Sequence, residues 1–134
     1  MLDVATGTGV AAFMAAERVG MAGEVVATDI SQKMVDSTRA AAAQRGVINM
    51  QFERVDAEEL GYADGSFDAA TCVLGLMYPT DPQRAIEQMH RVLKPGGRLS
   101  QSGADEIAAD GPRSSRSSTR AWSLTFARCF SSLT

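Results

Sequence analysis

Leu2-Asp-Val-Ala-Thr-Gly-Thr-Gly9, followed directly by Val10-Ala-Ala12, is the stretch that decides the fold. A short apolar run that carries one acid, Asp3, leads into a glycine turn, and an alanine-rich helical run follows without a spacer. Gly7 and Gly9 suit a turn that bends sharply and lets a ligand approach the backbone, because a Cβ would obstruct both. The stretch therefore predicts the strand, turn and helix of a nucleotide-binding βα unit.

A second carboxylate, Asp29, ends the next apolar run, Val25-Val-Ala-Thr-Asp29. This run has no polar alternation, which is typical of a parallel strand covered on both faces by helices. An acid at the carboxyl end of such a strand can accept hydrogen bonds from both hydroxyls of a ribose. The glycine pattern from Gly7 to Ala12 also fits a tight turn in any α/β protein, and it is the position of Asp29 that favours a nucleotide site.

Length and composition restrict the other possibilities. The chain has 134 residues, 45% of them hydrophobic, which suits one globular domain, and its net charge of −3 does not support a nucleic-acid partner. No apolar run approaches the roughly 20 residues that span a bilayer, and no secretory signal precedes the first strand. Cys72 and Cys129 form neither a disulfide framework nor a metal-ligand cluster, and His90 is expected at the surface. We therefore expect a cytoplasmic protein without a metal or a transmembrane segment.

Alternating strand and helix patterns continue to residue 99. They predict a helix over 10–19, a helix capped by Ser31 and ended by Gly46, a half-exposed edge strand around Met50, a loop over 56–66, a strand over 67–74, a helix capped by Asp81, and a fifth strand beginning at Arg98-Leu99. Such repeats predict an α/β fold with a doubly wound, mostly parallel sheet and a ligand at the carboxyl ends of its strands.

The last part of the chain breaks this pattern. Nine of the twelve serines fall between Ser100 and Thr134, and the fifth strand is expected to lose its pattern at Ser100-Gln-Ser102. Residues 1–99 are therefore interpreted as the core domain and residues 100–134 as an atypical tail. The tail is predicted to be disordered over 100–120, with a short helix over 121–130.

Together these stretches resemble the class I S-adenosylmethionine-dependent methyltransferases of the ubiquinone/menaquinone-biosynthesis type. The resemblance covers residues 1–99. The matching pieces are Leu2-Asp-Val-Ala-Thr-Gly-Thr-Gly9, Ala27-Thr-Asp-Ile-Ser31, Asp56-Ala-Glu58, Asp64-Gly-Ser-Phe-Asp68, Leu74-Gly-Leu-Met77 and Arg91-Val-Leu-Lys-Pro-Gly-Gly-Arg98.

The resemblance implies S-adenosyl-L-methionine as the cofactor and a role for each matching residue. Asp3 and the turn would hold its methionine portion, Asp29 its ribose, and Ile30 would offer an apolar surface to the adenine. Asp56, which otherwise is an ordinary loop acid, would accept a hydrogen bond from the adenine amino group while the Ala57 N–H meets a ring nitrogen. The implied cofactor-binding residues are Asp3, Ala5, Gly7, Thr8, Gly9, Asp29, Ile30, Asp56, Ala57, Cys72 and Val73.

The implied reaction is in-line displacement of a methyl group from the sulfonium onto a small-molecule acceptor, for which a quinone-like molecule is one candidate. Because the methyl is already activated, the protein mainly aligns donor and acceptor at about 3 to 3.5 Å and excludes water. The motifs therefore require no catalytic base, and we nominate none. Cys72 and Val73 would lie near the sulfur, where the quinone-type enzymes have serine at the position of Val73.

Two alternatives remain open at this point. The chain starts inside the first strand and its pattern fails after Leu99, so it could be a truncated product that binds the cofactor without turnover, with an out-of-frame tail. It could also be a fragment of a nicotinamide-dependent oxidoreductase, because the glycine turn and the ribose acid are shared with that class. Asp3 inside the first strand and Lys94-Pro-Gly-Gly97 favour the methyltransferase.

Overall fold

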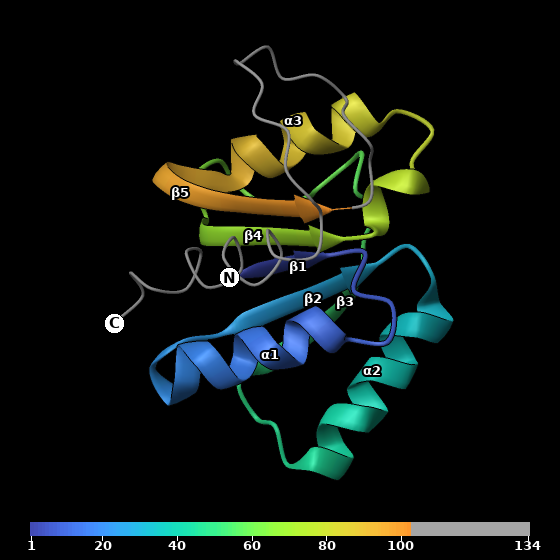
Figure 1. Cartoon of the computed structure of the whole chain (residues 1–134), viewed down its shortest axis with the longest axis vertical. Helices are drawn as coiled ribbons and strands as arrows, with labels where there is room; N and C mark the ends of the chain where they lie inside the picture. The colour runs from blue at the N-terminus through green and yellow to red at the C-terminus, as the bar shows by residue number, and fades with distance from the viewer. Residues whose placement is uncertain (103–134) are drawn as a thin grey trace, which may run out of the picture.

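A five-stranded parallel sheet forms the centre of the computed structural model, which describes residues 1–102. The strand order is β3-β2-β1-β4-β5, so the chain starts in the middle of the sheet and winds outward in both directions (Figure 1). The strands are β1 (Leu2–Val4), β2 (Val25–Asp29), β3 (Met50–Arg54), β4 (Phe67–Val73) and β5 (Leu93–Ser102). The expected doubly wound α/β fold is confirmed, with β3 at one edge of the sheet.

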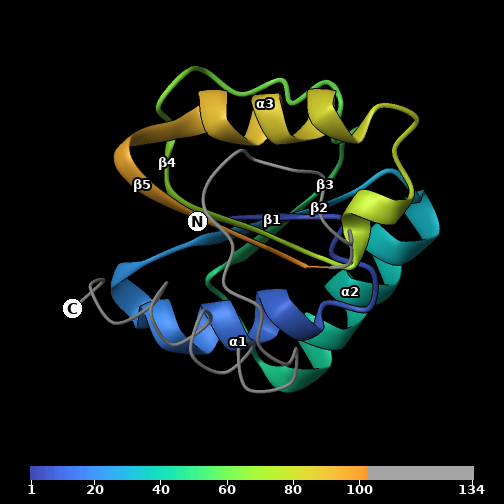
Figure 2. The ribbon, with the colours of Figure 1, turned by 45° about the horizontal axis from the view of Figure 1, so that its top comes forward.

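Helices cover both faces of this sheet. α1 (Val10–Val19) and α2 (Gln32–Arg45) lie on one face and α3 (Pro82–Val92) lies on the other (Figure 2). Two short 3-10 helices, η1 (Gly20–Ala22) and η2 (Gly75–Met77), follow α1 and β4. The three layers bury the apolar strands on both sides, which explains why Val25–Asp29 shows no alternation and is buried throughout.

Each helix-covered face has its own hydrophobic core. The core under α3 contains Leu2, Val4, Val26, Leu60, Phe67, Ala70, Cys72, Leu76, Ala85, Met89 and Val92. The core under α1 contains Ala12, Ala15, Ala16, Val25, Ala27, Met50 and Ala69. The small alanine side chains of α1 let that helix lie close to the sheet, and this places the glycine turn directly at the strand ends.

Helix ends follow the sequence signals. The Ser31 hydroxyl accepts a hydrogen bond from the Met34 N–H at 3.4 Å, and Asp81 Oδ1 accepts one from the Arg84 N–H at 3.0 Å. Gly46 ends α2 in the left-handed conformation, at φ 68°. The expected caps at Ser31 and Asp81 and the expected stop at Gly46 are confirmed.

The fifth strand differs from its prediction. β5 begins at Leu93, and its pairing with β4 continues through Ser100, Gln101 and Ser102, opposite Thr71, Cys72 and Val73. The prediction that the strand fails at Ser100 is wrong, because backbone hydrogen bonds to β4 hold these residues whatever the polarity of their side chains. The regular sheet therefore extends three residues beyond the expected core boundary at residue 99.

Several expectations concern residues beyond 102. The disorder predicted over 100–120 is wrong for residues 100–102, which belong to β5. The rest of that segment, the short helix over 121–130 and Cys129 lie outside the described residues. Within residues 1–102, no helix is long and apolar enough to cross a membrane. The expected cytoplasmic location and the division at residue 99 stay predictions.

Candidate functional site

The glycine turn between β1 and α1 is held from several directions. The Thr6 N–H donates to the Thr28 carbonyl of β2 at 2.8 Å, and the Gly9 N–H donates to the Thr6 carbonyl at 2.8 Å. From α2, the Thr38 hydroxyl donates to the Gly7 carbonyl at 2.8 Å. The turn is thus bonded to itself, to β2 and to α2, which makes it a rigid part of the carboxyl edge of the sheet.

Gly9 is required by close packing as well as by its conformation. Its φ is 83°, and a Cβ placed there would lie 2.5 Å from Thr38 Cγ2 and 2.9 Å from the Phe13 ring. α1 and α2 therefore meet at this residue. Thr38 is fully buried and was not predicted as part of the site, because a lone threonine on a helix carries no signal of its partner 31 residues away.

Asp29 faces the glycine turn. Its Oδ2 accepts a hydrogen bond from the Gly7 N–H and its Oδ1 accepts one from the Ser31 N–H, both at 2.9 Å. Asp29 as a whole residue is 9% exposed. Because each carboxylate oxygen has two lone pairs, these backbone bonds orient the group and leave acceptor capacity for hydroxyls of a ligand.

Asp3 is fully buried in the middle of β1. Neither carboxylate oxygen has a hydrogen-bond partner among the described residues, and the same holds for the neighbouring Thr6 hydroxyl. Burial raises the pKa of Asp3 to about 7; the nearby Thr6 hydroxyl opposes this and the charge of Asp29 adds to it. A buried carboxylate without a partner is costly, so it is a place where a cationic group of a ligand would be stabilised.

A cavity of about 130 Å³ opens at the carboxyl edge; Asp3, Gly7, Gly9 and Asp29 do not line it, but Ile30, the residue after Asp29, does. It brings together four of the predicted site residues from three separate segments: Ala5, Ile30, Asp56 and Ala57. Ile30 is 59% exposed, so its apolar side chain is available to a ligand. The remaining wall was not predicted as part of the site and consists of Val55, Glu58, Gly75, Tyr78, Pro79 and Thr80.

The sequence contained only an indirect signal for that wall. Leu74-Gly-Leu-Met77 belongs to the matching pieces and Asp81 is expected to cap a helix, but neither signal indicates a cavity. A Cβ on Gly75 would lie 2.4 Å from the Ala5 Cβ and 2.6 Å from the Cys72 Sγ. Gly75 therefore lets η2 pack against the end of β1 and form one side of the cavity.

The other predicted residues do not line the cavity. Thr8 is exposed in the turn, Val73 is half-buried at the end of β4, and Cys72 is fully buried in the core under α3. Burial and the neighbouring Asp3 raise the pKa of the Cys72 thiol to about 12, so it is a neutral thiol at physiological pH. Their contacts with a cofactor stay predictions.

The residues present fit S-adenosylmethionine. Asp3 offers a partnerless carboxylate to an ammonium group, and Gly7 has no atom within 4 Å of where a Cβ would stand, which leaves room for a ligand against the turn. The cavity offers an apolar surface at Ile30 and a carboxylate at Asp56. Among residues 1–102, no group of three His, Cys, Asp or Glu side chains could hold a metal ion.

Comparison with known proteins gives the same picture. The model of a methyltransferase domain family matches residues 1–97. The chain is 44% identical, over 100 residues, to the ubiquinone/menaquinone biosynthesis C-methyltransferase UbiE of Idiomarina loihiensis, an alignment that covers 74% of this chain and 40% of that protein. The chain thus spans about 40% of the length of the curated relatives it matches.

Solved structures agree in fold. The crystal structure of the [4+2]-cyclase SpnF matches with a TM-score of 0.68 and 39% identity, covering 73% of this chain and 36% of that chain. A SAM-dependent methyltransferase from Aquifex aeolicus matches with a TM-score of 0.72 over 97% of this chain and 70% of that chain, and its 21% identity supports the fold alone. On the match over residues 1–97, the chain belongs to the methyltransferase domain family.

Proposed function

We propose that this chain binds S-adenosylmethionine at the carboxyl edge of its sheet and serves methyl transfer to a small-molecule acceptor. The observation that carries the proposal is the position of Asp29, which is bonded to the glycine turn through Gly7 and directly precedes Ile30, a residue that lines the cavity together with Asp56. Membership of the methyltransferase domain family implies this cofactor and favours it over a nicotinamide nucleotide.

Each part of the site suits one part of the cofactor. Asp29 would accept hydrogen bonds from the ribose hydroxyls, and Asp3 would pair with the amino group of the methionine portion. Asp56 and the Ala57 N–H would read the edge of the adenine, which would lie on Ile30. When bound, S-adenosylmethionine supplies a methyl group that is already activated by its sulfonium.

The chain's own task in the reaction is binding and orientation. The bonded glycine turn and the buried Asp3 are preorganised, so little ordering is required when a ligand binds. No described residue has to act as a base for this task. The acceptor is proposed to be a small molecule of the quinone type, since the curated relative named above is a ubiquinone/menaquinone biosynthesis C-methyltransferase.

A two-stage experiment tests the proposal. Calorimetry should detect binding of S-adenosylhomocysteine, the demethylated product, to the 134-residue chain, and Asp29→Ala should abolish it. Incorporation of labelled methyl from S-adenosylmethionine is then measured across a panel of quinones, phenols and amines. Absence of binding to the wild-type chain would contradict the proposal.

The second stage separates binding from turnover. Binding without methyl incorporation would support the alternative of a chain that binds the cofactor without catalysis. That result would also leave room for another reaction on the same fold, because one similar structure is a [4+2]-cyclase.

A further inference from the structure

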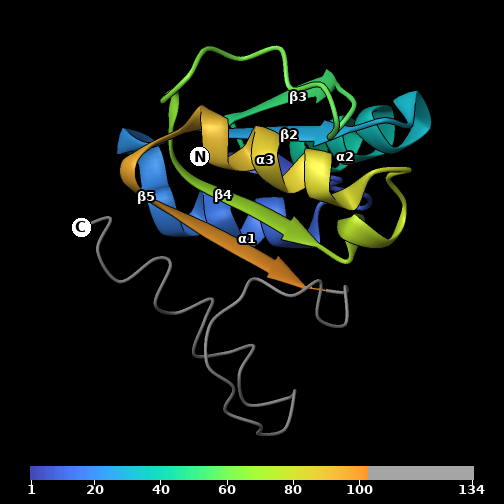
Figure 3. The same cartoon turned by 90° about the horizontal axis from the view of Figure 1, so that it is seen from above.

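The connection between β3 and β4, residues 55–66, crosses from the carboxyl edge to the amino edge of the sheet without a helix (Figure 3). We call it the 55–66 crossover. A helix would satisfy its own backbone groups, whereas an irregular segment needs partners from elsewhere. This segment begins with Val55, Asp56 and Ala57, which line the cavity. Whatever holds the crossover therefore also positions these residues.

Arg91, in the last turn of α3, holds the middle of the crossover. Its guanidinium donates to the Leu60 carbonyl, to the Tyr62 carbonyl at 2.8 Å and to Asp64 Oδ1 at 2.7 Å. It also donates to Gln88 Oε1 at 3.0 Å, which fixes the guanidinium on its own helix. A planar group with five donors can satisfy all these acceptors together, and a lysine ammonium cannot.

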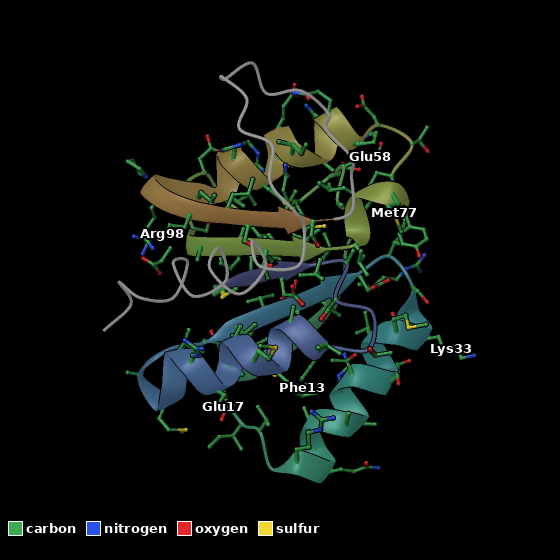
Figure 4. All side chains as sticks on the ribbon, viewed as in Figure 1. Phe13, Glu17, Lys33, Glu58, Met77 and Arg98 are labelled. Carbon is green, nitrogen blue, oxygen red and sulfur yellow. The ribbon has the colours of Figure 1, made fainter. Side chains whose placement is uncertain are left out.

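Glu58 holds the beginning of the crossover at the other end of α3. Its N–H donates to Asp56 Oδ1 at 2.9 Å, and its Oε1 accepts a hydrogen bond from the Asp81 N–H at 3.0 Å. Asp81 in turn caps α3. Figure 4 shows the Glu58 side chain beside the first turn of that helix. The Glu58 backbone N–H therefore orients the Asp56 carboxylate, and the Glu58 side chain ties this part of the backbone to the start of α3.

The same contact joins the two walls of the cavity. One wall comes from residues 55–58, and the other comes from Gly75 and residues 78–80, which lead into Asp81. The Glu58–Asp81 hydrogen bond links the two walls directly. Its loss would let the walls separate while the glycine turn, held by β2 and α2, stays in place.

We infer that Glu58 and Arg91 are positioning residues: their hydrogen bonds attach the 55–66 crossover to the two ends of α3 and so hold Asp56 and Ala57 against the adenine. This inference rests on the proposed function. It assigns selectivity for the base to two side chains that act through Asp56 and Ala57. Neither side chain is among the eleven cofactor-binding residues expected from the sequence.

Base selectivity is the property to measure, because it separates positioning from a loss of folded protein. Calorimetry would give the affinities of the full chain for S-adenosylhomocysteine and for S-inosylhomocysteine, in which an oxygen replaces the adenine amino group. A destabilised variant loses affinity for both ligands equally, so the ratio of the two dissociation constants is unaffected by the folded fraction. Wild-type protein should prefer the adenosyl ligand by about 100-fold, since a carboxylate that pairs with an amino group rejects its oxygen analogue.

Glu58→Ala and Arg91→Lys should each reduce this preference by about tenfold or more. Glu58→Gln keeps an oxygen that can accept from the Asp81 N–H and should retain most of the wild-type ratio. Lys94→Ala is the matched control: it removes the ion pair with Asp68, 2.8 Å long, at the amino edge of the sheet, and should leave the ratio unchanged.

The possible results distinguish a failure of this inference from a failure of the proposed function. An unchanged ratio in both Glu58→Ala and Arg91→Lys would overturn the inference while leaving cofactor binding intact. A wild-type chain that binds both ligands equally would also overturn it, because Asp56 would then not read the adenine. A wild-type chain that binds neither ligand would instead refute the proposed function.

Discussion

The two halves of the site are built differently. The half around the glycine turn is held by short bonds from β2 and α2, through the Thr6 N–H and the Thr38 hydroxyl. The half around Asp56 is an irregular crossover, held by side chains of which several are exposed. Buried, close-packed contacts tolerate little change, whereas exposed contacts contribute less to folding. Substitutions in the first half should therefore affect stability, and those in the second half should affect selectivity.

The largest loss of stability is expected from Gly9→Ala. The new Cβ meets Thr38 Cγ2 at 2.5 Å and the Phe13 ring at 2.9 Å, and a φ of 83° adds strain of its own. Together these effects should lower the free energy of unfolding by about 3 kcal/mol or more in urea titrations. Gly46→Ala is the control, because its φ is 68° with nothing within 4 Å, and it should cost only about 1 kcal/mol. Equal losses in the two variants would show that packing at the turn is not tight.

Asp3→Asn should act in opposite directions on stability and binding. Because burial raises the pKa of Asp3 to about 7 from an ordinary value of 3.8, the folded state holds a proton that the unfolded state has lost. Stability should therefore fall as the pH rises from about 4 to about 7 and level off above that. The asparagine variant should lack this slope and gain about 2 kcal/mol at pH 8, once the cost of burying its amide is included.

The same variant should bind S-adenosylhomocysteine about tenfold or more weakly, because a buried ion pair with its amino group is lost. Thermal unfolding across this pH range and calorimetry at pH 8 measure the two effects. A variant that is both less stable and unaffected in binding would contradict the assignment of Asp3 to the ligand.

Thr38→Val should cost about 1 to 2 kcal/mol. It keeps the shape of the side chain and removes the hydrogen bond to the Gly7 carbonyl, which is left without that donor. Thr71→Val is the matched control, because the Thr71 hydroxyl is buried and has no hydrogen-bond partner among the described residues. That control should be neutral or stabilising in the same urea titration. Destabilisation of the control to the same extent would remove the support for a special role of the turn bond.

The smallest effect on stability is expected from Glu58→Ala. Its contact with the Asp81 N–H is exposed, so its loss should lower the free energy of unfolding by less than about 1 kcal/mol. Chemical denaturation measures the change in the free energy of unfolding, which should be small. The ratio of the two dissociation constants, measured on the same variant, should change by a large factor. If the free energy of unfolding instead fell by about 3 kcal/mol, Glu58 would contribute to folding as strongly as the contacts around the glycine turn do.

The same division separates what the sequence predicted from what it missed. Val25–Asp29 and Val10–Val19 were predicted to their observed bounds, because burial on both faces and glycine at the helix ends leave local patterns. The contacts of Thr38 and Arg91 join residues far apart in the chain and leave no pattern of their own. The prediction ended β5 before Ser100, whereas the strand continues to Ser102. Its pairing with β4 depends on backbone atoms, which side-chain polarity does not report.

The candidate site follows this rule too. Asp29 and the glycine turn stand at the ends of regular elements, where position along a strand predicts position in space. The cavity wall from Gly75 and residues 78–80 depends on how η2 packs against Ala5, which is a tertiary contact. The sequence therefore predicted the residues at strand ends and missed the wall that faces them.

The most direct test is a crystal structure of the chain with S-adenosylhomocysteine. The ribose hydroxyls should lie within hydrogen-bonding distance of the Asp29 carboxylate, and the adenine should lie between Ile30 and Ala57. The amino group of the homocysteine portion should lie beside Asp3. A ligand bound elsewhere, or an Asp29 carboxylate that makes no contact with the ribose, would contradict the assignment of the site.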